Sequence, residues 1–143
     1  MRPSIAILPL LLLCACPGDP ASHLESAREL TFRRQPREAL REYEEVLSLL
    51  SKKDGAKARE VLVPALKGAG DLCYLELKQV ARAMEHYQML VRRFPDAPEA
   101  LDARANLADI LRTSGDRRGA VAELSSIVQS FPDAPEVDRY LYQ

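Results

Sequence analysis

The chain has 143 residues, with 20 basic and 21 acidic side chains that give a formal net charge of −1 at pH 7. A chain so close to neutral lacks the basic surface that nucleic-acid binding requires, so no nucleic-acid partner is expected. Alanine, leucine, arginine and glutamate dominate and tryptophan is absent, a composition that favours helices over strands. No stretch alternates β-branched and polar residues as a strand does, so the sequence predicts an all-α fold.

The N-terminal segment has the three parts of an export signal. One basic residue precedes an apolar run over residues 5–13, and the small Ala15 lies directly before Cys16. The run is too short for a membrane-spanning helix, which needs about 20 apolar residues, and Pro9 interrupts it. An ordinary secretory peptide would have a small residue where Leu13 stands. A plain secreted protein and a buried N-terminal helix are therefore the weaker alternatives.

The sequence Leu13-Cys14-Ala15-Cys16 resembles the lipobox of bacterial lipoproteins. In that family the cysteine after the cleavage site receives lipid on its sulfur and then on its new amino group. The resemblance implies a signal peptide over residues 1–15 and a tether over residues 16–21 that begins with the lipidated Cys16. It also implies a location in the bacterial cell envelope, facing the periplasm. Pro17 follows the cysteine where an aspartate would favour the inner membrane, so the resemblance implies an anchor in the outer membrane rather than the inner membrane.

Capping and turn residues predict the helices of the N-terminal half. Ser22 begins a capping-box pattern that opens a first helix, and Pro36 suits the first turn of a second helix. Asp54-Gly55 restarts the chain for a long helix that extends to about Leu77. Pro64 lies inside this segment and should kink the helix or split off a short lead-in.

The C-terminal half contains two further predicted helices and a short tail. The helices extend over residues 98–113 and 117–130, and Gly115-Asp116 provides the turn between them. Residues 136–143 have room for about two helical turns. We expect this tail to form a capping helix, because its apolar side chains are spaced to cover the end of the fold: Val137, Tyr140 and Leu141.

A six-residue motif recurs within the chain. Phe94-Pro95-Asp96-Ala97-Pro98-Glu99 is repeated, thirty-seven residues later, as Phe131-Pro132-Asp133-Ala134-Pro135-Glu136. The segments before the two copies also align, with Ala83 opposite Ala120, and a third related segment begins at Ala39. A repeat period of about 20 to 50 residues is typical of stacked helical or strand units.

These segments resemble tetratricopeptide repeats, which are helical hairpins of about 34 residues. The resemblance implies three antiparallel hairpins, over about 22–53, 56–97 and 98–134, stacked as a short right-handed solenoid. In the family a small residue near the start of the second helix is followed four positions later by a large one, as here at Ala39 and Tyr43, Ala83 and Tyr87, and Ala120 and Leu124. The middle unit departs from the pattern, because Asp71 stands where its first helix should have a small residue. The adjacent Gly70 allows the alignment to slip by one.

The sequence nominates no catalytic centre. We expect His23 to be solvated, and His86 to be an exposed helix residue rather than a metal ligand or base, since no second histidine or cysteine lies at ligand spacing. Cys73 is predicted to be a small buried hydrophobe, with a redox or intermolecular thiol as the alternative. We therefore predict no enzyme, no cofactor, no metal and no small-molecule substrate.

Stacked hairpins present a concave surface formed by their first helices, which can hold a peptide or a partner helix. The resemblance places six residues in a partner-binding groove: Arg28, Leu72, Leu75, Asn106, Asp109 and Arg112. Core packing between repeats is an equal alternative for Leu72 and Leu75. The groove would accept a segment of a protein, not a small molecule.

A lipobox followed by such repeats resembles envelope lipoproteins of Gram-negative bacteria, namely those of outer-membrane protein assembly and those associated with the Tol–Pal system. The resemblance implies a scaffold that is attached to a membrane through the lipid on Cys16 and binds another envelope protein. The alternative is a structural envelope lipoprotein that associates with itself through the end faces of its stack.

Overall fold

The computed structural model describes residues 18–135, so the predicted signal peptide, Cys16 and the predicted capping helix over 136–143 lie outside the described residues. Within the described range the chain forms six α-helices, one π-helical turn and no strand. These elements are α1 (Pro20–Phe32), α2 (Pro36–Leu49), α3 (Ala56–Asp71), the π-helical turn η1 (Leu72–Glu76), α4 (Val80–Arg93), α5 (Pro98–Thr113) and α6 (Arg117–Ser130).

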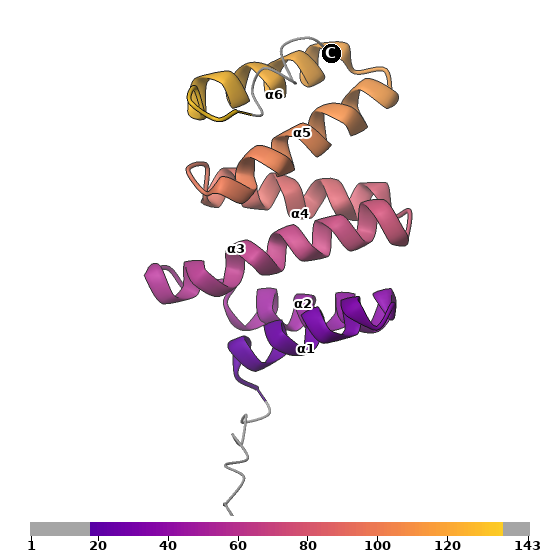
Figure 1. Cartoon of the computed structure of the whole chain (residues 1–143), viewed down its shortest axis with the longest axis vertical. Coiled ribbons are helices and arrows are strands. Elements are labelled where there is room, and N and C mark those ends of the chain that lie inside the picture. The colour runs from indigo at the N-terminus through magenta and orange to yellow at the C-terminus, as the bar shows by residue number, and fades with distance from the viewer. Residues whose placement is uncertain (1–17, 136–143) are drawn as a thin grey trace, which may run out of the picture.

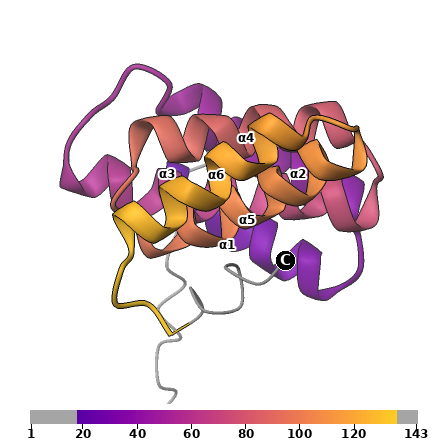
Figure 2. The same cartoon turned by 90° about the horizontal axis from the view of Figure 1, so that it is seen from above.

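The helices stack as consecutive antiparallel hairpins along the long axis of the molecule (Figure 1). Each helix packs against the helix before it and the helix after it, including between hairpins, where α2 contacts α3 and α4 contacts α5. Figure 2 shows α2 and α4 on one side of the stack and α1 and α5 on the other. The predicted fold class, an all-α solenoid of helical repeats, is confirmed.

Small residues hold the hairpins together at the predicted positions. Ala27, Ala39 and Ala83 are fully buried, and Ala120 is 5% exposed. Because alanine has only a methyl group, two helix backbones can approach closely at these points, and the adjacent large side chains fill the remaining space. One continuous core cluster extends from α1 to α5.

The start of α1 differs from the prediction. The helix begins at Pro20, and Ser22 lies within its first turn instead of capping it. Asp19 is the residue before the helix, and its side chain makes no capping hydrogen bond. Proline fixes φ near the helical value and needs no N–H partner in the first turn, so the helix starts three residues earlier than a cap at Ser22 would give. The same effect at Pro36, predicted correctly, opens α2.

The long third helix is confirmed, with one difference at its end. α3 continues through Pro64 as a single helix, so no separate lead-in is split off. The chain remains helical to Glu76, but its last turn, η1, is π-helical. The ranges of α5 and α6 are those predicted, and Gly115 turns the chain between them with φ of 90°.

Candidate partner-binding surface

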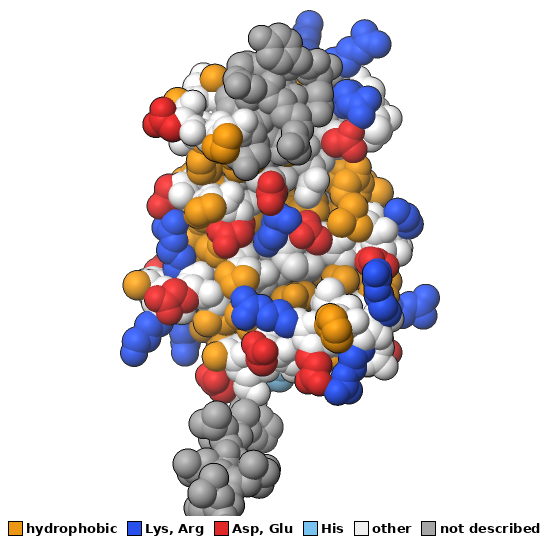
Figure 3. Space-filling model, viewed as in Figure 1, with side chains coloured by type: hydrophobic (Ala, Val, Ile, Leu, Met, Phe, Trp, Pro, Cys, Tyr) orange, Lys and Arg blue, Asp and Glu red, His pale blue; other side chains and the backbone are white. Residues whose placement is uncertain are grey.

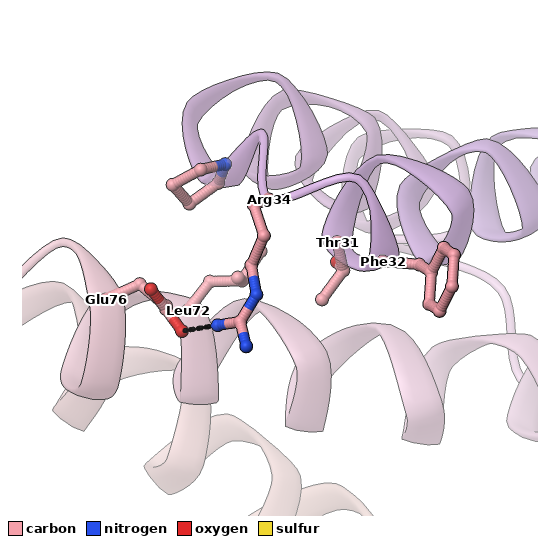
Figure 4. Close-up of a pocket in the computed structure, with 6 residues that line it drawn as sticks. Thr31, Phe32, Arg34, Leu72 and Glu76 are labelled. Atoms are coloured by element: carbon pink, nitrogen blue, oxygen red, sulfur yellow. Dashed lines mark hydrogen bonds and ion pairs between the residues drawn. The ribbon is translucent and has the colours of Figure 1, made fainter.

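A surface cavity of about 290 Å³ lies between the end of α1 and η1 (Figure 4). Leu72, only 5% exposed, contributes to its lining. Arg34 reaches across from the α1–α2 turn to Glu76, with 3.4 Å between Arg34 Nη1 and Glu76 Oε1. The other lining residues are Thr31, Phe32 and Pro36. The cavity therefore lies at the junction between the first and second hairpins.

A second cavity of about 250 Å³ shares residues with the first and extends the surface along η1. Leu75 lines it and is 57% exposed, and Phe32 beside the first cavity is 88% exposed. Phe32 and Leu75 are thus two large apolar side chains that are exposed to solvent beside these two cavities. Figure 3 shows basic and acidic side chains interspersed with hydrophobic ones on this face, and neither sign of charge dominates. We call the two joined cavities the α1–η1 groove.

The π-helical turn explains why the middle repeat departs from the family pattern. Gly70, not Asp71, is its small position, since a Cβ added at Gly70 would lie 2.5 Å from Cε1 of Tyr87. Gly70 is four residues before Tyr74, whereas Ala108 of the last repeat is three residues before Leu111. A π-helical turn accommodates one extra residue, and the N–H of Leu77 accordingly donates to the carbonyl of Leu72 at 2.9 Å. The one-residue slip is confirmed.

Hydrogen bonds between side chains connect the second and third hairpins. The amide of Asn106 donates to the Tyr87 hydroxyl at 3.0 Å, and that hydroxyl donates to Asp71 at 2.8 Å. Lys67 donates to the other oxygen of Asp71 at 2.6 Å. Burial raises the pKa of Tyr87, so its hydroxyl remains a proton donor to Asp71. Asn106 is therefore engaged within the fold.

A separate hydrogen bond, on the same side of the repeats, joins η1 to α5. The hydroxyl of Tyr74 donates to Asp109 at 2.6 Å, and Arg112 donates to the other oxygen of Asp109. The bond from Tyr74 and then the one from Arg112 hold the pKa of Asp109 below its ordinary range. Asp109 is thus an ionised acceptor with two partners inside the chain, which reduces what it can offer to a partner protein.

The six predicted groove residues do not meet in one groove. Leu72 and Leu75 belong to the α1–η1 groove, where Leu72 is core and Leu75 is exposed. Arg28 lines a different cavity, beside α3 and the start of α5. Asp109 and Arg112 line a third cavity, on the α5–α6 hairpin, and Asn106 bonds to Tyr87 as described.

Sequence reasoning missed Phe32, which is the most exposed large apolar side chain of the described residues. A signal was present, because the buried stripe of α1 contains Leu24 and Ala27 and Phe32 falls off that stripe. Arg34 and Glu76 could not be paired from the sequence, since 42 residues separate them.

The histidines and the cysteine are more enclosed than exposed. His86, predicted to be exposed, has a side chain only 12% exposed, so that prediction is wrong. His23, predicted to be solvated, is 25% exposed and lies 2.7 Å from Glu42, so it too is more constrained than expected. Each histidine lies beside a glutamate of α2, His23 beside Glu42 and His86 beside Glu44, and the sequence pattern of one helix does not show such a neighbour. Cys73 is fully buried, and burial raises the pKa of its thiol. The prediction that Cys73 is a small buried hydrophobic residue is therefore confirmed.

The described residues hold neither a candidate metal cluster nor a candidate membrane span. In residues 18–135, no group of three or more histidine, cysteine, aspartate or glutamate side chains is placed to hold a metal ion. None of the helices described is both long and apolar enough to cross a membrane.

Comparison with known proteins agrees with the geometry. Residues 70–97, which extend from the end of α3 to the turn after α4, match the tetratricopeptide repeat family. The match supports a tetratricopeptide-repeat protein. Tetratricopeptide repeats are generally a non-enzymatic fold for protein interaction, so a protein-interaction scaffold with a protein partner is the function class supported here. No curated protein is significantly similar to the chain.

Proposed function

We propose that this protein is a lipid-anchored scaffold of the bacterial envelope, facing the periplasm, that binds a segment of another envelope protein. Cys16 would bear the lipid, and the outer membrane would be the anchor site. The repeats would supply the binding surface, and the anchor would hold that surface close to the membrane. A role in outer-membrane or envelope assembly follows from the same proposal.

The observation that supports binding is the apolar surface of the α1–η1 groove. Phe32 and Leu75 are largely exposed, although burying each would be favourable by about 1.5–3 kcal/mol. Large apolar side chains that flank a depression are typical of protein-binding sites, where a partner side chain covers them. A partner segment with apolar side chains, extended or helical, would fill the groove.

The extra residue in η1 supports the same surface. π-helical turns are rare and frequently lie at functional sites. In this chain the turn spans Leu72–Glu76, so it includes both the buried Leu72 and the exposed Leu75 of the groove. We infer that the extra residue turns Leu75 outward.

Site-specific crosslinking in intact cells tests the partner surface. A photo-crosslinking amino acid at Leu75 should give a discrete adduct with an envelope protein. The matched control is Leu49 on α2, an apolar side chain that is 40% exposed and does not line the groove. Phe32→Asp should abolish the Leu75 adduct by putting a charge in the contact. An equal adduct at Leu49, or an adduct that survives Phe32→Asp, would contradict the proposal.

The anchor is tested separately with Cys16→Ser. We expect mass spectrometry of the wild-type protein to show lipid on Cys16. We also expect the wild-type protein to sediment with outer membranes. The Cys16→Ser variant should lose the lipid and leave the membrane fraction, while its helical circular dichroism stays unchanged. If the wild-type protein has no lipid on Cys16, the proposed anchor is refuted, but the proposed binding surface is not.

A further inference from the structure

A third cavity, of about 290 Å³, lies on the outer side of the last hairpin. Its apolar lining comes from α5 and α6: Ala105, Ala108, Ala120, Val121 and Leu124. Asp109, Arg112 and Arg117 supply its charged lining. Val121 is 62% exposed and lies beside the alanines of this lining. We call this surface the end groove.

The matching surface of the preceding hairpin is covered in part, since Leu75 and Val80, the equivalents of Arg112 and Arg117, are exposed. Ala83 and Tyr87, which lie thirty-seven residues before Ala120 and Leu124, are both fully buried. α5 packs against α4, the helix that contains them. The end groove is therefore the surface on which a further helix would pack if the repeat continued.

The backbone after α6 has the same geometry as the backbone after α4. Phe94 donates its N–H to the carbonyl of Leu90 at 2.9 Å, and Phe131 donates to Ile127 at 2.9 Å. The N–H of the alanine three residues later returns to each phenylalanine carbonyl at 3.1 Å in both copies. The backbone angles also agree, with φ and ψ of −135° and 59° at Phe94 and −133° and 55° at Phe131. After the first copy, the next helix begins at Pro98 and covers α4.

We propose that residues 136–143 bind in the end groove as a short helix and take the place over α5–α6 that α5 takes over α3–α4. In this register Val137 and Tyr140 correspond to Ala100 and Ala103, which are fully buried in α5. Apolar residues thus occupy the two positions that must face the groove.

The side chains at two equivalent positions differ in size in opposite directions. The Tyr87 hydroxyl accepts a hydrogen bond from Asn106 of α5, so α5 lies against Tyr87. At the end of the chain Leu124 takes the position of Tyr87, and Tyr140 takes the position of Ala103. A smaller residue on α6 and a larger one in the tail keep the combined side-chain volume similar, and volume-conserving changes are the ones that cores tolerate.

This contact would decide whether the protein associates with itself. With the tail bound, Val121 and Leu124 are covered and the stack is closed. With the tail removed, an apolar end face is exposed and can meet a second copy. The inference does not depend on the lipid anchor or on the α1–η1 groove.

Paired substitutions in the protein expressed from the full chain test the tail. Tyr140→Asp puts a charge in the contact, and Tyr142→Asp is the matched control, because it lies about 200° around the same helix. On the groove side, Val121→Asp is compared with Ala122→Asp at the adjacent exposed residue. We expect Tyr140→Asp and Val121→Asp each to lower the melting temperature by about 4 °C or more, with little change in the controls.

The double variant and the oligomeric state complete the test. If Tyr140 covers Val121, the two shifts in melting temperature should be less than additive, because either substitution already breaks the contact. Deleting residues 136–143 should cause concentration-dependent association in size-exclusion chromatography, reversed by adding Val121→Asp. Equal effects of Tyr140→Asp and Tyr142→Asp would overturn the proposal. So would an unmodified protein that is dimeric and becomes monomeric on Val121→Asp, because the occupant would then be a second copy.

Discussion

Two glycines in α3 set the distance between neighbouring helices. A Cβ at Gly68 would lie 2.5 Å from Cζ of Tyr43, and one at Gly70 would lie 2.5 Å from Cε1 of Tyr87. Both tyrosines are buried, and the Tyr87 hydroxyl is bound on two sides, so its ring cannot move aside at low cost. The helix therefore uses glycine for close approach, although glycine is a poor helix former.

Gly70→Ala should destabilise the protein in spite of the better helix propensity of alanine. The propensity gain is about 1 kcal/mol, and overpacking a filled core costs about 1–3 kcal/mol. We expect a net loss of about 1 kcal/mol in the free energy of unfolding, measured by urea denaturation. In a Tyr87→Leu background the clash is relieved, so the same substitution should become neutral or stabilising. A loss of equal size in both backgrounds would contradict the steric explanation.

His86 makes the stability of the fold depend on pH. Burial lowers its pKa below the ordinary value of 6.5, Glu44 and Glu85 oppose this effect, and Arg82 adds to it. Glu44 Oε1 lies 3.9 Å from His86 Nε2 and also pairs with Arg82. The imidazole therefore remains neutral in the folded protein at a pH where the unfolded chain is protonated.

The sign of the effect follows from proton binding. Below about pH 6.5 the unfolded chain binds a proton at His86 that the folded chain does not, so stability falls as the pH decreases. His86→Gln removes this titration. We expect the unfolding free energy of the unmodified protein to decline more steeply than that of His86→Gln between pH 7.5 and about 5.5. Parallel curves would show that His86 does not contribute.

At the scale of single elements, α6 has a side-chain cap that the other helices lack among the described residues. Asp116 accepts a hydrogen bond from the N–H of Gly119 at 2.9 Å. Helices α1, α2 and α5 instead begin with proline in the first turn. The last hairpin therefore depends on a capping hydrogen bond, whereas the start of the chain depends on the fixed φ of proline.

Asp116→Ala should lower the free energy of unfolding by about 1 kcal/mol, because one N–H at the start of α6 loses its acceptor. Asp19→Ala is the matched control: Asp19 also precedes a helix, but its side chain makes no capping bond. Chemical denaturation of both variants should show a clear loss for Asp116 and almost none for Asp19. Equal losses would mean that local charge, not the hydrogen bond, matters.

At the scale of the whole molecule, polar contacts join the second and third hairpins, which also share the core cluster that extends from α1 to α5. Tyr87 of the second hairpin connects Asp71 of its own hairpin to Asn106 of the third. Each repeat contacts only its neighbours, so the strength of such contacts determines whether the stack unfolds as one unit. Asn106, which was predicted to bind a partner, therefore makes a contact between hairpins instead.

Tyr87→Phe should weaken the junction between the second and third hairpins. Removing the hydroxyl leaves Asn106 without that partner, and we expect a loss of about 1–3 kcal/mol. Asn106→Ala alone should also destabilise, and the double variant should lose less than the sum, as measured by a double-mutant cycle. Strict additivity would show that the two side chains do not act together.

The sequence by itself was sufficient for the helices and the repeats. The Phe-Pro-Asp-Ala-Pro-Glu duplication and the alanines at Ala39, Ala83 and Ala120 carried the resemblance to tetratricopeptide repeats, which implied three hairpins. The proposed lipid anchor rests on the sequence alone, since Cys16 lies outside the described residues. Local pattern and period depend on residues near one another in the chain, and a sequence shows these directly.

Only the tertiary structure decided which side chains are free to bind. Asn106 and Asp109 lie on a helix that was expected to form the groove. Their side chains are instead hydrogen-bonded to Tyr87 and Tyr74 of the preceding hairpin. Leu72 and Leu75 are three residues apart in η1, yet one is buried and the other exposed. Burial and hydrogen bonding depend on the neighbouring helix, whose register in this chain is set by a single inserted residue.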